Sequence, residues 1–168
     1  MSDTVLAARE VVAVDTNVLL RATLNEAGLE TESAAARRIL ASGRQDVLIA
    51  DVTIVEYVHA LETHYHLSRS MICELVSTIA RLRHVSCSGD VILAALARFC
   101  DKPTLSFNDC FIAEHARANR AVPLWTFDPK LANQYDLAAL VTSAPASAGR
   151  YRPARSVPSA SEARHGLK

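Results

Sequence analysis

Four acidic residues stand where carboxylates are able to do chemistry together. Asp15 ends the β-branched run VVAV, and Asp128 follows the short apolar stretch PLWTF. Glu56 lies in the first turn of one expected helix, and Asp109 opens another. Carboxylates within ~4–6 Å of one another repel unless a cation binds among them. Hard divalent cations with oxygen ligands meet this need, and Mg²⁺ takes carboxylates, waters and substrate phosphate oxygens. The set therefore predicts a site for Mg²⁺, with Mn²⁺ as the alternative.

Two of these acids also have a purely structural interpretation as helix caps. Thr53-Ile-Val-Glu56 fits a capping box, in which Glu56 reaches back to the backbone amide of Thr53. Ser106-Phe-Asn-Asp109 fits the same pattern at the next acid. Capping needs no metal and no neighbouring acid, so for each residue taken singly it competes with the chemical interpretation.

The other two acids have comparable alternatives. Asp128 precedes Pro129 and is able to cap a helix that has proline at its first position. Asp15 is able to act as a turn acid that bonds Asn17. What favours a shared role is the expected meeting of all four carboxylates at one edge of the fold.

Apolar periodicity predicts alternating strands and helices along most of the chain. Strands are expected at Val11–Val14, Val47–Ala50, His84–Ser86 and Pro123–Thr126. Helices are expected at Val18–Leu24, Ser33–Ala41, Thr53–His64, Ser70–Leu82, Asp90–Phe99, Asp109–Asn119 and Pro129–Gln134. Such alternation is typical of βαβ units. We therefore expect a three-layer α/β domain over residues 11–142, with a central parallel sheet flanked by helices.

The expected sheet gives the acids their common position. In open parallel sheets, ligands bind outside the carboxyl ends of the strands. Asp15, Glu56 and Asp128 all follow strands there, and the helix that Asp109 opens must pack on the same sheet. Bound metal at this edge is able to activate water, orient a phosphodiester and stabilise its leaving oxygen. The pattern favours metal-assisted phosphodiester hydrolysis. None of the four candidate ligands is a histidine or a cysteine, which favours Mg²⁺ or Mn²⁺ over zinc.

The zero net charge of the 168-residue chain hides an uneven distribution. Residues 143–168 carry five basic residues and one acid. Removing them from the chain's 18 basic and 18 acidic residues leaves 13 and 17, a net charge of −4 for the rest. This tail is rich in Ser, Ala, Pro and Arg, a composition typical of disorder. We expect a leader at 1–10, one folded domain and a disordered basic tail.

Other features of the sequence indicate a cytoplasmic protein. No apolar run approaches the ~18 residues that a membrane span needs, and residues 1–10 lack the features of a signal peptide. The four cysteines have no CxxC spacing, so we expect reduced thiols, mostly buried.

The four acidic motifs together resemble a known family. VVAVDTNVLLR, TIVEYVHAL, LSFNDCFIA and WTFDPKLA look like the motifs of the PIN-domain ribonucleases and, more closely, of the VapC-type toxins of bacterial toxin–antitoxin pairs. The resemblance covers residues 11–141. It implies a PIN fold and an endoribonuclease that hydrolyses RNA with Mg²⁺ or Mn²⁺. By position it assigns the metal to the four acids, with polar support from a few neighbours: Thr16, Asn17 and Thr126.

The resemblance also bears on partners. VapC-like proteins pair as homodimers and bind an antitoxin protein. Helices 33–41 and 53–64 carry apolar residues at helical spacing, and we expect them to form the face for pairing and for an amphipathic antitoxin segment. These residues are Ile39, Leu40, Ile54, Val58 and Leu61. Arg21 closes the first motif and is a candidate contact for substrate phosphate or for a partner.

Three alternative functions stay open. Related PIN domains process RNA without an antitoxin. A non-catalytic interaction module would use the same scaffold, although all four acids are present here. A haloacid-dehalogenase-type phosphohydrolase also begins with a strand and an aspartate, but its pattern has a second aspartate where this chain has Asn17.

Overall fold

The computed structural model describes residues 9–142, so almost all of the expected leader and all of the expected tail lie outside the described residues. Within this part the predicted elements form, most of them within three residues of the expected ends. Strands are β1 (Val11–Ala13), β2 (Asp46–Leu48), β3 (Val85–Ser86), β4 (Leu124–Thr126) and β5 (Ala138–Leu140). Helices are α1 (Thr16–Thr23), α2 (Glu30–Ala41), α3 (Asp51–Thr63), α4 (Arg69–Ala80), α5 (Gly89–Asp101), α6 (Phe107–Ala118) and α7 (Pro129–Gln134).

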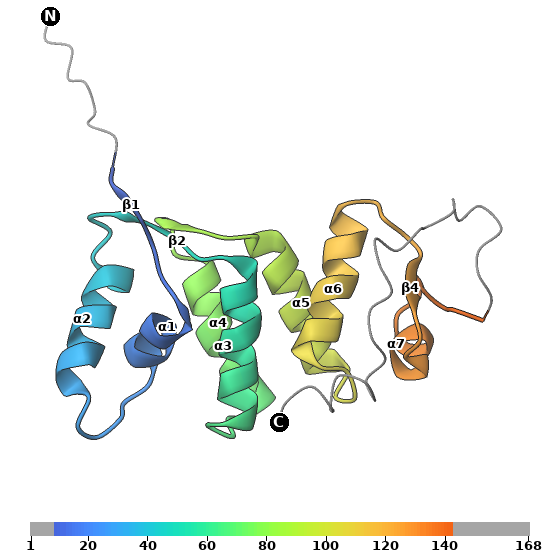
Figure 1. Cartoon of the computed structure of the whole chain (residues 1–168), viewed down its shortest axis with the longest axis horizontal. Helices are drawn as coiled ribbons and strands as arrows, with labels where there is room; N and C mark the ends of the chain where they lie inside the picture. The colour runs from blue at the N-terminus through green and yellow to red at the C-terminus, as the bar shows by residue number, and fades with distance from the viewer. Residues whose placement is uncertain (1–8, 143–168) are drawn as a thin grey trace, which may run out of the picture.

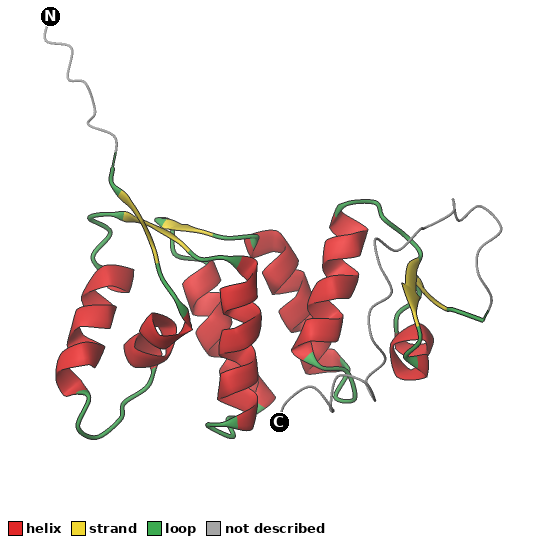
Figure 2. Cartoon of the chain, viewed as in Figure 1, coloured by secondary structure: helices red, strands yellow, loops and turns green. Residues whose placement is uncertain are grey.

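The first three strands form one parallel sheet in the order β1-β2-β3. Val12 pairs with Val47, which in turn pairs with Val85. Each connection between these neighbours passes through two helices, as parallel strands require. Figure 2 shows the strands at the top of the molecule, with most helices below them. The predicted α/β class with a parallel sheet is confirmed.

The last two strands form a second, separate sheet. β4 pairs in parallel with β5, with Leu124 opposite Ala138. We expected β4 in the central sheet, and β5 was missed because its sequence, Ala-Ala-Leu, has no β-branched residue. In Figure 1, β4 and α7 lie beyond α6, at the opposite end of the molecule from β1.

β4, α7 and β5 form a C-terminal unit, and contacts with α5 and α6 hold it in place. The Tyr135 side chain is fully buried, and its hydroxyl donates a hydrogen bond to the carbonyl of Ala113 in α6 over 3.0 Å. The guanidinium carbon of Arg98 in α5 lies 4.4 Å from the centre of the Tyr135 ring. Leu131 of α7 is buried too. The position of β4 and β5 therefore follows from packing of α7 and Tyr135 rather than from strand pairing with β1.

The main core corrects the expectation about self-association. Ile54, Val58 and Leu61 of α3 and Leu40 of α2 belong to the buried cluster beneath the sheet, and Ile39 packs against it. Burying one such side chain stabilises a fold by about 1.5–3 kcal/mol. These residues are used inside the protein, so the prediction that they form a free face for a second copy or an antitoxin segment is wrong.

The cysteines differ from expectation as well. Cys73 of α4 and Cys100 of α5 form a disulfide, because these two helices pack side by side. The expectation of reduced thiols is wrong for this pair. Of the two free cysteines, Cys110 is buried and Cys87 partly buried, and burial raises the pKa of the Cys110 thiol to about 11. In residues 9–142, no helix is both long enough and apolar enough to cross a membrane.

Candidate functional site

Asp15 stands at the junction of β1 and α1. The sheet directs β1 to this point, and Asp15 caps α1 by accepting a hydrogen bond from the backbone amide of Val18 through Oδ1, over 3.0 Å. The expected turn therefore exists, but its partner is Val18 rather than Asn17. Asp15 Oδ2 has no hydrogen-bond partner among the described residues. The side chain is exposed, so this oxygen remains available to a ligand.

Glu56 is fixed by the residue that follows Asp15. Thr16 Oγ1 donates a hydrogen bond to Glu56 Oε2 over 2.6 Å, across 40 positions of sequence. Thr16 is buried at the start of α1, so its hydroxyl is held in place. The expected capping box of Thr53 and Glu56 is wrong, because α3 begins at Asp51 and no side chain caps it.

Asp109 caps its own helix, as its structural interpretation predicted. Its Oδ2 accepts from the Ser106 amide over 3.2 Å and from the Ser106 hydroxyl over 2.6 Å, and its own amide donates to Ser106 Oγ over 3.1 Å. The capping box is therefore confirmed. Oδ1 makes no hydrogen bond within the part of the chain that the structure describes.

A cavity joins the Glu56 helix to the Asp109 turn. It has a volume of about 420 Å³ and lies between α3 and the start of α6. Its polar lining comes from Glu56, His59 and Glu62 on one side and from Ser106 and Asn108 on the other. Sequence analysis did not single out these last four residues for the site. His59 and Glu62 lie three and six positions after Glu56, a helical spacing that places all three on one face.

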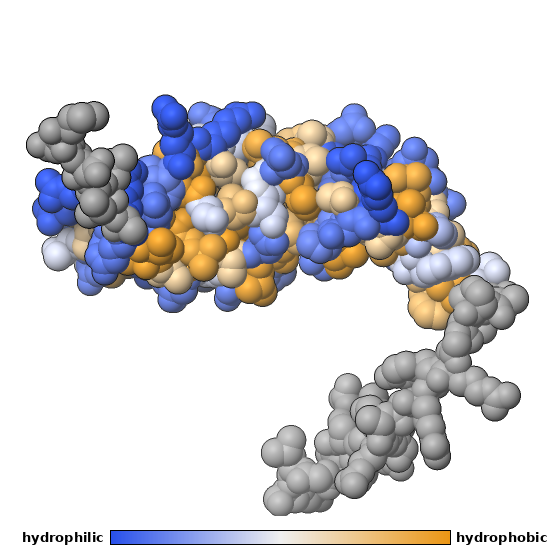
Figure 3. All heavy atoms as spheres, turned by 90° about the horizontal axis from the view of Figure 1, so that it is seen from above, coloured by the Kyte–Doolittle hydropathy of each residue, from blue (hydrophilic) through white to orange (hydrophobic). Residues whose placement is uncertain are grey.

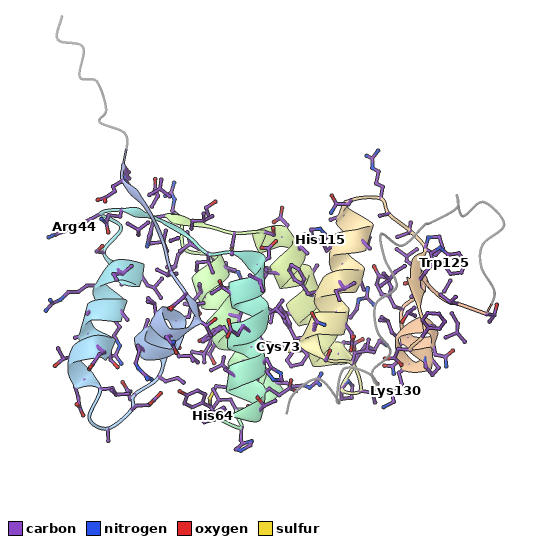
Figure 4. All side chains as sticks on the ribbon, viewed as in Figure 1. Arg44, His64, Cys73, His115, Trp125 and Lys130 are labelled. Carbon is purple, nitrogen blue, oxygen red and sulfur yellow. A yellow bond between two sulfur atoms is a disulfide. The ribbon has the colours of Figure 1, made fainter. Side chains whose placement is uncertain are left out.

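Asp128 does not line the cavity beside Glu56. It caps α7 by accepting from the Lys130 amide over 2.8 Å, and its own amide donates to Thr126 Oγ1 over 2.9 Å. The predicted N-cap with Pro129 at the first helical position is thus confirmed. However, Asp128 belongs to the C-terminal unit, which is not paired with β1. Figure 4 shows the neighbouring Trp125 and Lys130 at this end of the molecule, with Arg44 at the other.

The two remaining candidates differ in their surroundings. Asn17 is exposed beside Asp15. Arg21 donates a hydrogen bond to Glu26 Oε1 over 2.6 Å, and the Tyr65 hydroxyl donates to the same oxygen over 2.5 Å. This hydrogen bond to Glu26 raises the pKa of Tyr65. Arg21 is thus engaged within the protein, next to the loop that follows α1.

The oxygens available near the cavity fit a hard divalent cation. Asp15 and Glu56 each keep one carboxylate oxygen without a hydrogen-bond partner in residues 9–142, and such oxygens are able to accept a ligand. Mg²⁺ needs only one or two protein carboxylates, since water and phosphate complete its coordination. Among residues 9–142, however, no three acidic, histidine or cysteine side chains are grouped closely enough to hold one ion.

Parallel strands flanked by helices define an α/β protein, in which Thr16 links the turn after β1 to Glu56 of α3. The sequence profile of the PIN domain matches residues 12–137, three quarters of the chain. The chain therefore belongs to the PIN domain family, whose members are generally nucleases, that is, hydrolases. No curated protein matches the sequence significantly.

Proposed function

We propose that this protein is a metal-dependent endoribonuclease and the toxin of a toxin–antitoxin pair. The observation that carries the proposal is the hydrogen bond from Thr16 to Glu56. It fixes an exposed carboxylate of α3 next to the turn that holds Asp15. Glu56 also lines the cavity beside the Ser106 and Asn108 end of α6, which supports counting Asp109 with Asp15 and Glu56.

In this proposal Asp15, Glu56 and Asp109 provide the oxygens for Mg²⁺ or Mn²⁺, and Asp128 provides a fourth carboxylate. The bound ion would supply Lewis acidity toward the phosphodiester and lower the pKa of a water molecule. Thr16 positions Glu56 by donating a hydrogen bond to its Oε2. Asn17 lies two positions after Asp15, and Thr126 lies two positions before Asp128, where each would support the nearby acid.

The cavity gives the substrate a place to enter. Its open side is lined by the exposed side chains of Val52 and His59, and Asn108 adds an amide that is able to contact phosphate or sugar. Because the folded part is net acidic, metal rather than bulk positive charge must offset the phosphates. This requirement is consistent with a nuclease that binds RNA weakly without its cation.

One assay separates this function from the alternatives. The full chain is incubated with labelled single-stranded RNA and, in parallel, with a small phosphomonoester, each with and without Mg²⁺ or Mn²⁺. We expect internal cleavage of RNA that depends on the metal and no release of inorganic phosphate from the monoester. Phosphate release without RNA cleavage would indicate a phosphohydrolase, and no reaction with either substrate would indicate an interaction module.

The toxin role rests on the resemblance to VapC-type proteins and needs its own test. Expression of the wild-type chain should arrest bacterial growth, whereas expression of Asp15→Asn should not. Co-expression of the short reading frame next to the gene should restore growth and yield a complex. Growth that is equal with wild type and Asp15→Asn would instead favour an RNA-processing nuclease. The antitoxin needs a surface other than the apolar residues of α2 and α3, which are buried.

A further inference from the structure

Arg69 connects α4 to the loop between α5 and α6. Its Nη1 donates hydrogen bonds to the carbonyl oxygens of Phe99 over 2.7 Å and of Lys102 over 3.2 Å, and its Nη2 donates to the carbonyl of Leu105 over 2.9 Å. The guanidinium carbon also lies 3.9 Å from the centre of the Phe99 ring. A guanidinium is planar and presents five donors in a fixed geometry. One side chain therefore fixes both the end of α5 and the loop that follows it.

This loop leads directly into the turn that holds Asp109. Leu105 is buried, and the next residue, Ser106, forms the capping box with Asp109. Ser106 also lines the cavity of about 420 Å³ between α3 and α6. Its neighbour Phe107 lines the same cavity and packs edge-on against Phe99, with ring centres 5.9 Å apart. The α6 wall of the cavity is therefore supported by the loop and the ring that the guanidinium contacts.

The same guanidinium reaches the opposite wall of the cavity. Glu62 lines the cavity from α3, and its Oε1 lies 3.5 Å from Arg69 Nη2. Both side chains are partly exposed, so this ion pair contributes less than the three charge-assisted hydrogen bonds to carbonyl groups. Arg69 itself does not line the cavity. It joins the two walls from outside the space between them, and it holds the α6 wall more strongly than the α3 wall.

These contacts lie at the end of the helices opposite to the first sheet. Figure 1 shows the turn between α3 and α4 and the loop between α5 and α6 at the bottom of the molecule, whereas β1 and β2 lie at the top. Figure 3 views the molecule from above, where hydrophobic patches alternate with charged groups. The disulfide between Cys73 and Cys100 joins α4 to α5 as well. Because this bond holds the two helices together, loss of the Arg69 side chain frees the loop without separating them.

We propose that Arg69 is a positioning residue: by fixing the loop before α6, it sets the place of Ser106 and Asp109 relative to Glu56 across the cavity. This inference rests on the proposed nuclease. Residues that hold metal ligands in place typically contribute about ten- to a hundredfold to activity or metal affinity. Because Arg69 does not line the cavity, its loss should lower the maximal rate of cleavage rather than the affinity for RNA.

The rates of RNA cleavage by Arg69→Met and Arg37→Met test the inference. Arg37 is the matched control, because it donates to the carbonyl groups of Ala22 and Leu24 at the end of α1, and none of these residues lines the cavity. At saturating RNA and Mg²⁺, Arg69→Met should cleave about ten- to a hundredfold more slowly than wild type, with an unchanged KM. Arg37→Met should cleave at the wild-type rate. A wild-type rate for Arg69→Met, an equal loss in both variants, or a change in KM alone overturns the proposal.

Arg69→Lys separates the geometry of the hydrogen bonds from the charge. A lysine ammonium keeps the attraction to Glu62, but it is a compact charge that does not span the carbonyl groups of Phe99 and Leu105 together. The maximal rate of Arg69→Lys should therefore fall by about tenfold, while urea unfolding shows most of the stability retained. A wild-type rate for Arg69→Lys would show that the charge alone suffices, which contradicts positioning through the loop.

Amide hydrogen exchange of the full chain keeps this inference distinct from the proposed function. Exchange in residues 102–109, measured without RNA or metal, should be faster in Arg69→Met than in wild type and unchanged in Arg37→Met, because Arg69 and not Arg37 donates to the carbonyl groups of this loop. Unchanged exchange in Arg69→Met overturns the proposal whether or not the protein cleaves RNA. If wild type cleaves no RNA while exchange in Arg69→Met is faster, the proposed nuclease fails and the placement of the loop by Arg69 stands.

Discussion

The Thr16 hydroxyl donates a 2.6 Å hydrogen bond to Glu56, and this contact joins the end of β1 to the middle of α3. It connects two of the four acidic motifs directly. Thr16 is buried while Glu56 is exposed, so a buried hydroxyl restrains a surface carboxylate. Oε2 of Glu56 is fixed by this bond, and Oε1 has no hydrogen-bond partner in residues 9–142.

Replacing Thr16 should therefore lower activity without removing any metal ligand. Thr16→Val keeps the size of the side chain but leaves Glu56 unrestrained. Partners that orient metal ligands typically contribute ten- to a hundredfold in activity or metal affinity, and we expect a loss of about that size. Thr16→Ser keeps the hydroxyl and should retain most of the activity. Rates of RNA cleavage measured at several Mg²⁺ concentrations compare the variants. Equal rates for the valine and serine variants would show that the hydrogen bond has no role in positioning.

The capping box at α6 allows the two roles of Asp109 to be separated. Ser106→Ala removes the cap side chain and should lower the free energy of unfolding by about 1 kcal/mol, with cleavage at saturating Mg²⁺ little changed. Asp109→Asn keeps an acceptor for the Ser106 amide, so it should remain stable while losing most of its activity. Urea unfolding and RNA cleavage are measured on both. If Asp109→Asn is as active as wild type, Asp109 is a cap and nothing more.

A buried acid in α6 should dominate the acid sensitivity of the fold. Glu114 is 3% exposed and accepts from Arg98 over 2.8 Å and from Arg117 over 2.6 Å. Burial raises the pKa of Glu114, but the hydrogen bonds from both arginines outweigh it, so its pKa lies below the ordinary value of 4.5. The stabilisation is therefore present above pH 4.5 and is lost as the pH falls through the lowered pKa.

Glu114→Gln should accordingly cost about 1.5–3 kcal/mol at neutral pH, the usual contribution of hydrogen bonds to charged groups. The difference from wild type should shrink as the pH falls below 4.5. Glu74→Gln, at an exposed position that forms no ion pair in the described part, is the control and should change little. Urea unfolding from pH 7 to pH 3 measures these differences. A gap between wild type and Glu114→Gln that is constant over this range would contradict the assigned pKa.

The C-terminal tail should contribute little to RNA binding. Residues 143–168 carry a net charge of +4 by sequence, which would add only modest and salt-dependent attraction to RNA. We expect the chain cut after residue 142 to bind RNA like the full chain from low to physiological salt. Affinities of the two proteins at several salt concentrations provide the comparison. Weaker binding at low salt, with a flatter salt dependence, would show that the tail contacts RNA.

Local sequence patterns predicted most helices and strands, because the ends of these elements depend on residues that are close in the sequence. α7 begins and ends where Pro129 and Gln134 predicted, since a proline after an aspartate cap is a strong local signal. The predicted capping box of Thr53 and Glu56 is absent because α3 begins at Asp51, before its predicted start. Glu56 instead accepts a hydrogen bond from a residue 40 positions away. Such a contact leaves no local trace in the sequence.

Strand pairing was the harder part of the fold. The sequence indicated that β4 is a strand, but its neighbour depends on where α5, α6 and α7 pack. Tyr135 decides this through a hydrogen bond to Ala113, a contact between helices that periodicity does not predict. α2 and α3 do carry apolar residues at helical spacing. This spacing does not distinguish a helix face buried in the core from one that binds a partner. Leu61, for example, is fully buried.

Metal-dependent cleavage by Asp15→Asn tests the central claim most directly. Asparagine is as good a helix cap as aspartate, so the hydrogen bond to the Val18 amide and the fold should survive. Single-turnover cleavage of labelled RNA is measured for wild type and Asp15→Asn from zero to saturating Mg²⁺, with unfolding curves to verify stability. We predict no wild-type cleavage after chelation, recovery on adding Mg²⁺, and a rate for Asp15→Asn that is lower by orders of magnitude at every concentration. Equal rates for the two proteins at saturating Mg²⁺, or wild-type cleavage that persists in chelator, would contradict the account.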